Sequence, residues 1–129
     1  MKKILVIDDD ELLTKTFSRL LQKLQYDVVV MTRPEDAVTL AAGGNFDLIL
    51  CDIRMPGKNG VETIREIQAG AKKSGRAPVP VIFLTGFADN KLEQEAQALN
   101  PVAYIYKPFD TVKLLELISS TLKNSINLK

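Results

Sequence analysis

The sequence predicts an α/β protein with a five-stranded parallel sheet covered by helices on both faces. Short apolar runs alternate five times with segments whose apolar residues recur at helical spacing. Several of these runs are apolar almost throughout, which is typical of parallel strands buried on both faces. We therefore expect a doubly wound sheet of order 2-1-3-4-5 with five helices, in a three-layer αβα sandwich.

Each strand and helix follows from a local pattern. The expected strands cover residues 3–8, 27–31, 47–51, 79–84 and 102–106. The expected helices cover about 12–24, 34–42, 60–69, 89–98 and 111–122. Pro34 suits a first helical turn, and Gly43 with Gly44 supplies a stop. The polar, basic residues 71–78 are expected to form an exposed loop.

Length and composition favour one domain. The 129 residues, 46% of them hydrophobic, are enough for one buried core over about 3–122, with a short tail at 123–129. A net charge of +1 gives no general reason to expect nucleic acid binding. The apolar run after Met1 is too short and too soon interrupted by acids for a signal peptide, and no run is long enough to span a membrane. We expect a cytoplasmic protein that binds no membrane.

Two residue types limit the chemistry. Cys51 is the only cysteine, so we expect it to be a small buried apolar residue rather than a redox centre. The chain has no histidine, which excludes Ser-His-Asp triads, histidine-based zinc sites and an internal phosphohistidine.

Acidic residues end two of the strands. Asp8 and Asp9 follow the first strand and Asp52 follows the third, and strands 1 and 3 are neighbours in the expected order. Ligands of such sheets bind at the carboxyl ends of the strands. Carboxylates this close together need a cation, and Mg²⁺ (or Mn²⁺) is the simplest one, because it prefers oxygen ligands. Asp10 is more simply explained by its place at the start of a helix.

A hydroxyl and an amine end two further strands. Thr85 follows the fourth strand and Lys107 the fifth. A hydroxyl can donate a hydrogen bond to a phosphoryl oxygen, and an ammonium can neutralise its charge. The Lys107-Pro108 bond is a candidate cis peptide. Together these groups predict a pocket for a metal ion and a phosphoryl group.

The ordered set of motifs resembles the response regulator receiver domains of bacterial two-component signalling. It consists of Asp8-Asp9, Asp52 with Met55-Pro56 and Gly60, Thr85-Gly86, and Lys107-Pro108-Phe109. The resemblance spans residues 3 to about 122 and implies a flavodoxin-like fold. It also implies a single receiver domain that works as a phosphorylation switch rather than as an enzyme.

The resemblance assigns a role to each matching residue. Asp52 accepts a phosphoryl group from a partner's phosphohistidine, and Thr85 and Lys107 hold the phosphoryl oxygens. Asp9, Asp52 and the backbone carbonyl of Arg54 bind Mg²⁺ directly, whereas Asp8 acts through water. Thr85 and Tyr104 form the switch: Thr85 moves toward the phosphate, Tyr104 turns inward, and the surface of helix 4, strand 5 and helix 5 changes its affinity for a partner.

Other implications concern rates and partners. Arg54 and Phe87 occupy positions that in this family tune the hydrolysis of the aspartyl phosphate, and a bulky Phe87 suggests a phosphorylated state that is not among the shortest lived. The implied partners are a sensor histidine kinase or histidine phosphotransfer protein, and an effector protein or fused output domain. A monomer or a weak, phosphorylation-dependent dimer is expected. Lys58 and Asn59 depart from the family pattern, but in a loop outside the pocket.

Three alternatives stay open at this point. A haloacid-dehalogenase-like phosphatase would use Asp8 and Asp10 with Thr85 and Lys107, but it leaves Asp52 without a role. A flavodoxin-like nucleotide or flavin binder shares the fold, but it needs a phosphate loop where this chain has three acids. A phosphorylation-independent interaction module is disfavoured by the complete set of acids, threonine and lysine.

Overall fold

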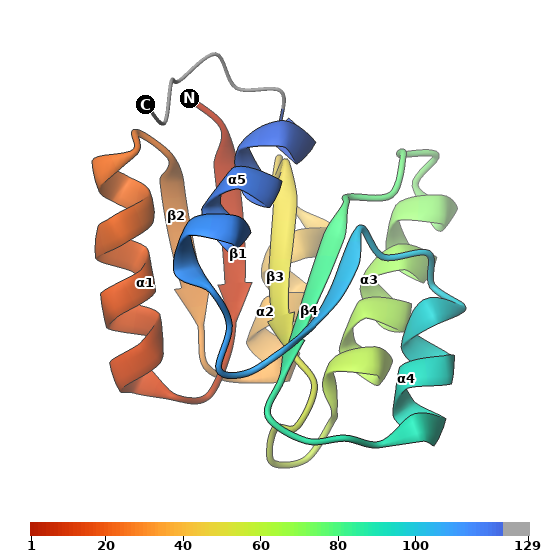
Figure 1. Ribbon diagram of the computed structural model, residues 1–129. Helices are drawn as coiled ribbons and strands as arrows, with labels where there is room; N and C mark the ends of the chain where they lie inside the picture. The colour runs from red at the N-terminus through yellow and green to blue at the C-terminus, as the bar shows by residue number, and fades with distance from the viewer. Residues whose placement is uncertain (123–129) are drawn as a thin grey trace.

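The computed structural model, which describes residues 1–122, is an αβα sandwich with five parallel strands in the order β2-β1-β3-β4-β5 (Figure 1). The predicted fold class is therefore confirmed. The strands are β1 (Lys3–Ile7), β2 (Asp27–Met31), β3 (Leu48–Asp52), β4 (Val81–Thr85) and β5 (Ala103–Tyr106). The helices are α1 (Glu11–Lys23), α2 (Pro34–Ala42), α3 (Gly60–Lys73), α4 (Asn90–Gln97) and α5 (Thr111–Leu122). The expected tail, 123–129, lies outside the described residues.

The core has two layers because successive strand residues point to opposite faces of the sheet. Leu5 and Ile7 pack on the side of α2, α3 and α4, whereas Ile4 and Val6 pack on the side of α1 and α5. β3 and β4 are buried along their whole length. Central strands buried on both faces hold the site residues at their carboxyl ends on a rigid support.

Two expectations about the outer elements need correction. β2 was expected to be buried on both faces; its side chains do pack on both core layers, but they are only partly buried or exposed, because β2 is an edge strand. α3 was expected to end near residue 69, but it continues to Lys73. Ala71 is buried against the core and the basic Lys72 and Lys73 suit the negative end of a helix, so residues 71–73 are helical rather than part of a loop.

The strand boundaries also shift slightly. β4 begins at Val81, two residues later than expected, because Pro78 and Pro80 have no N–H group for the ladder. β3 begins one residue later than expected and includes Asp52. Asp52 is therefore held in place by the hydrogen-bonded backbone of β3.

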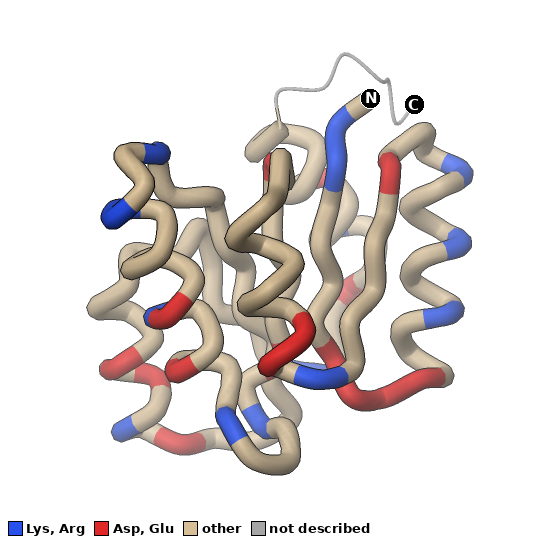
Figure 2. The backbone as a smooth tube through the Cα atoms, turned by 180° about the vertical axis from the view of Figure 1, so that it is seen from behind, with Lys and Arg blue, Asp and Glu red and all other residues tan. Residues whose placement is uncertain are grey.

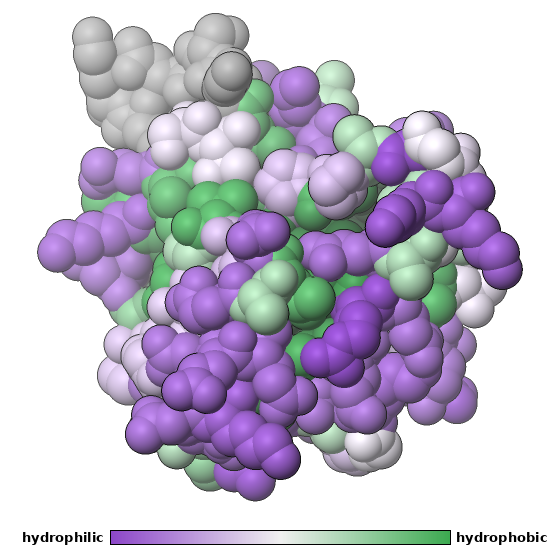
Figure 3. Space-filling view, turned by 90° about the vertical axis from the view of Figure 1, so that its right-hand side faces the viewer, coloured by the Kyte–Doolittle hydropathy of each residue, from purple (hydrophilic) through white to green (hydrophobic). Residues whose placement is uncertain are grey.

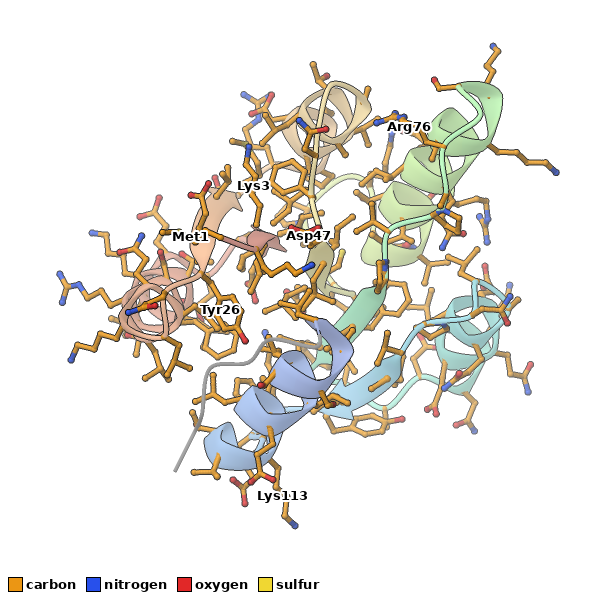
Figure 4. All side chains as sticks on the ribbon, turned by 90° about the horizontal axis from the view of Figure 1, so that it is seen from above. Met1, Lys3, Tyr26, Asp47, Arg76 and Lys113 are labelled. Carbon is orange, nitrogen blue, oxygen red and sulfur yellow. The ribbon has the colours of Figure 1, made fainter. Side chains whose placement is uncertain are left out.

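The end of the sheet away from the acids is closed by local contacts (Figure 4). The backbone N–H of Lys3 donates to Asp47 Oδ2 at 2.8 Å, and the N–H of Asp47 donates to the Lys3 carbonyl, also at 2.8 Å. The guanidinium of Arg76 donates to the carbonyls of Ala42 (3.0 Å) and Gly44 (3.4 Å). The Arg76 contacts tie the α3–β4 loop to the end of α2.

Candidate functional site

Three carboxylates meet where β1 and β3 end. Ligand oxygens of Asp8, Asp9 and Asp52 all lie within 4.8 Å of one another. Asp8 and Asp52 are buried, whereas Asp9 is exposed. The run of acids after β1 is visible at the lower edge of the sheet in Figure 2. The register that pairs Ile7 with Cys51 brings these residues together from distant parts of the chain.

Lys107 reaches into this cluster from the end of β5. Its Nζ lies 3.1 Å from Asp8 Oδ2 and 3.5 Å from Asp52 Oδ1. The peptide bond from Lys107 to Pro108 is cis, as the sequence suggested it could be. One ammonium against three carboxylates leaves two negative charges uncompensated. That excess suits a divalent cation with oxygen ligands.

The electrostatics of the pocket are unfavourable without such a cation. Burial, and next the charge of Asp8, raise the pKa of Asp52 from 3.8 to about 6, although Lys107 opposes this shift. Burial lowers the pKa of Lys107, but the charges of Asp8 and Asp52 outweigh it and raise the pKa overall. Asp52 is therefore a carboxylate that a positive charge would stabilise.

Backbone groups orient the two buried acids. The N–H of Asp10 donates to Asp8 Oδ1 at 2.9 Å, and the N–H of Ile53 donates to Asp52 Oδ1 at 3.0 Å. The carboxylate of Asp10 itself caps α1, accepting from the N–H of Leu13 at 3.1 Å. Asp10 thus serves the helix terminus and does not join the acidic cluster, which weakens the phosphatase alternative.

A family model decides between the alternatives. The model described as "Response regulator receiver domain" matches residues 4–119. The chain belongs to the response regulator receiver family. No helix among residues 1–122 is long and apolar enough to cross a membrane.

Individual relatives agree with this family. The receiver is 29% identical to the transcriptional regulatory protein FixJ of Bradyrhizobium diazoefficiens, covering 95% of this chain and 57% of FixJ. It is 33% identical to the transcriptional regulatory protein CpxR of Klebsiella pneumoniae, covering 97% of this chain and 51% of CpxR. The chain spans about half the length, or less, of the curated relatives that it matches.

Solved structures give the same result. A CheY-like receiver domain protein from Methanospirillum hungatei has a TM-score of 0.85 at 26% identity, covering 95% of this chain and 94% of that one. The response regulator TrrA of Thermotoga maritima, in complex with Mg²⁺-BeF, has a TM-score of 0.79 at 29% identity, covering 94% of this chain and 99% of that one. The chain is thus a receiver domain of the two-component signalling type.

The remaining predicted site residues lie at or just after the ends of β3 and β4. Thr85 is buried at the end of β4, and its hydroxyl contacts the backbone N–H and carbonyl of Phe87 at 3.2 and 3.4 Å. The guanidinium carbon of Arg54 lies 4.3 Å from the centroid of the Phe87 ring, at cation–π distance. Phe87 is 54% exposed, so this stack stands at the surface.

Tyr104 lies under α4 on the same face as Phe83. Its ring is 6.2 Å from Phe83 and 5.6 Å from Tyr106, in tilted and edge-on arrangements. The buried hydroxyl of Tyr104 has no hydrogen-bond partner among the described residues. Burial, and next the charge of Glu93, raise its pKa. Tyr104 thus contains a buried polar group that a rearrangement could satisfy.

Sequence patterns alone did not predict the roles of some residues around the site. Tyr106 had no assigned role; its hydroxyl donates to Glu93 Oε1 of α4, and this bond raises its pKa to about 12. Asn59, which departs from the family pattern, caps α3 together with Glu62 in a reciprocal capping box. A residue of the N-cap type three positions before a glutamate was a readable signal for that cap.

Gly60 has a role that only the structure defines. A Cβ at this position would lie 2.1 Å from the carbonyl oxygen of Asp52, far inside any contact distance. The N–H of Gly60 donates to the Ile53 carbonyl at 2.8 Å. α3 therefore begins directly against the backbone of the site.

Cys51 is a buried free thiol, as expected of a small apolar core residue. Burial raises the pKa of this thiol.

Proposed function

We propose that this receiver is switched by phosphorylation of Asp52. The observation that carries the proposal is the cluster of Asp8, Asp9 and Asp52, in which Lys107 bridges Asp8 and Asp52, so that an acceptor carboxylate lies beside two further acids and a cation. The similar Thermotoga maritima structure is a complex with Mg²⁺-BeF, which supports a phosphoryl site with a metal. A partner's phosphohistidine is the proposed donor, because this chain has no histidine.

The proposed transfer breaks one bond and forms another. An Oδ atom of Asp52 attacks phosphorus, the P–N bond to the donor histidine breaks, and the ring nitrogen leaves with the electron pair. The product is an aspartyl phosphate, which water later hydrolyses. We assign the same pocket to both steps, so the receiver is a signalling domain with only self-phosphotransfer and self-dephosphorylation activity.

Asp9, Asp52 and the backbone carbonyl of Arg54 would hold Mg²⁺ (or Mn²⁺), with Asp8 acting through water. When bound, the metal would neutralise charge on the acids and on the transferring phosphoryl group.

Lys107 would move from the carboxylates to a phosphoryl oxygen. The Thr85 hydroxyl would leave the Phe87 backbone and donate to a second phosphoryl oxygen. Arg54 and Phe87 would limit the approach of water.

The switch would pass from Thr85 to the surface of α4, β5 and α5. Movement of Thr85 would free space beside β5, where the Tyr104 hydroxyl is buried without a hydrogen-bond partner among residues 1–122. Three exposed apolar side chains, Val102, Tyr106 and Val112, lie on or beside this surface. Figure 3 shows the corresponding side of the molecule as mainly hydrophilic with smaller hydrophobic areas between the polar side chains. Such a mixed surface suits a reversible contact with an effector or output domain.

Intact mass after incubation with Mg²⁺ and acetyl phosphate tests this function. Wild type should gain the mass of one phosphoryl group, Asp52→Asn should gain none, and Asp36→Asn, which removes an exposed acid outside the pocket, should behave as wild type. Wild type that stays unmodified while a known receiver is phosphorylated would refute the proposal. Turnover of phosphate esters that survives in Asp52→Asn would instead indicate a phosphatase.

A further inference from the structure

β2 forms an edge of the sheet whose outer side has free backbone groups. Among the described residues it pairs only with β1. The N–H of Asp27 donates to the Lys2 carbonyl, which fixes the phase of the ladder. Because hydrogen bonding to one neighbour alternates along a parallel strand, the N–H and C=O groups of Val28 and Val30 point away from β1. These groups are placed to pair with an added strand.

Within residues 1–122, β2 has no lysine, proline, bulge or covering segment that would block strand pairing. Edge strands in soluble proteins are commonly blocked by lysine, proline, a bulge or a covering segment. β2 runs in unbroken register with β1, and Val28 to Met31 are apolar and partly exposed. Strands of this kind are the ones to which extended peptides add.

A ridge of cations on α1 lies beside this edge. Lys15, Arg19 and Lys23 follow one another at intervals of four residues, all are exposed, and none has an ion-pair partner in the described part of the chain. The blue segments of α1 in Figure 2 mark the basic positions of this helix. Like charges at this spacing repel one another, so the ridge is favourable only when anions compensate it.

A groove joins the ridge to the strand. It has a volume of about 520 Å³ and is lined from α1 by Glu11, Thr14, Lys15, Ser18 and Arg19, and at the end of β2 by Val30 and Thr32, so that two cations face one acid. We propose that this groove and the β2 edge bind an acidic, extended segment of a partner protein, which adds to β2 as a sixth strand. Its alternate acidic side chains would lie on the α1 side of the sheet, facing the cations, and its apolar ones would lie on the other side, beside Val29 and Met31.

Charge favours this occupant over a second copy of the chain. Two copies paired antiparallel through β2 would place both α1 helices on the same face of the joined sheet and bring their cationic ridges close together, and that arrangement is repulsive. The site lies at the edge of the sheet opposite β5, away from the surface of α4, β5 and α5 that the proposed switch would change.

Fluorescence anisotropy with a labelled peptide of alternating Glu and Val tests the charge requirement. The double variant Lys15→Glu/Arg19→Glu should raise the Kd about tenfold or more, because it replaces attraction by repulsion. Lys113→Glu, which makes the same kind of change on the exposed surface of α5, should leave the Kd unchanged (Figure 4). Equal binding by wild type and the double variant would overturn the proposal.

Backbone experiments test strand addition itself. The same peptide with alternate backbone amides N-methylated should lose binding, and the unmodified peptide should slow hydrogen exchange at the amides of Val28 and Val30. Binding that leaves these two amides unprotected would overturn the proposal. So would protection that appears without peptide and grows with protein concentration, because it would make a second copy the occupant.

Discussion

The position of the Asp52 carboxyl group in the site lowers the stability of the folded protein. Its pKa rises from 3.8 to about 6, chiefly through burial and the charge of Asp8. Because the folded-state value is the higher one, the native protein binds more protons than the unfolded chain between about pH 4 and pH 6. Stability should therefore fall as the pH rises through that window.

Asp52→Asn removes this cost. In metal-free buffer at pH 7 it should raise the free energy of unfolding by about 1 kcal/mol, less than the full shift implies because solvent screens the open side of the pocket. Urea unfolding from pH 3.5 to 8 would show the gain disappearing on the acid side, while Asp36→Asn shows no such pattern. A constant difference at every pH would contradict the electrostatic explanation.

The stacked side chains of Arg54 and Phe87 give a second prediction at the level of single residues. If it limits the approach of water to the aspartyl phosphate, Phe87→Ala should speed hydrolysis by about twofold to fivefold, the range that an exposed cation–π contact is worth. Decay of the phosphorylated mass after removal of the donor measures this rate. Val112→Ala, which trims another exposed apolar side chain, serves as the control. An unchanged rate in Phe87→Ala would remove the stack from the mechanism.

At the scale of elements, the start of α3 is fitted closely to β3. Gly60→Ala would place a methyl group 2.1 Å from the Asp52 carbonyl oxygen, so the helix or the strand end must shift. We expect a loss of about 3 kcal/mol in the free energy of unfolding, together with weaker phosphorylation, because Asp52 itself moves.

Gly70 provides a matched control within the same helix. A Cβ there meets nothing within 4 Å. Gly70→Ala should therefore stabilise the protein by about 0.5–1 kcal/mol, through helix propensity alone. Chemical denaturation of the two variants, with phosphorylation assayed in parallel, separates close packing from propensity. Equal effects of both substitutions would show that the short distance at Gly60 is relieved at no cost.

The elements also show which parts of the fold were readable in the sequence. Five alternations of apolar run and helical period were enough to predict every strand and helix, because buried parallel strands and amphipathic helices have distinct periods. The end of α3 was not readable, since residues 71–73 begin a basic, turn-rich stretch that is typical of a loop, and only the structure shows that Ala71 is buried. The partial exposure of β2 follows from its edge position rather than from its composition.

At the scale of the whole molecule, the site depends on topology. Asp8 and Asp52 are far apart in the chain and meet because strand 1 lies beside strand 3. Each acid was visible in the sequence at a strand end, so their meeting could be predicted. The hydrogen bond from Tyr106 to Glu93 and the fit of Gly60 against Asp52 could not, because both depend on how a helix packs on a strand.

Because the metal site depends on the fold, metal binding should stabilise the folded protein against unfolding. The unfolded chain does not hold Asp8, Asp9 and Asp52 together, so Mg²⁺ should bind the native protein alone and stabilise it. At about one hundred times the Kd, the free energy of unfolding should rise by about 2.7 kcal/mol. Thermal unfolding over a range of Mg²⁺ concentrations should show this increment in wild type and in Asp36→Asn. It should be lost in Asp9→Asn, whose exposed side chain has little other structural role. An increment that survives in Asp9→Asn would place the metal elsewhere on the molecule.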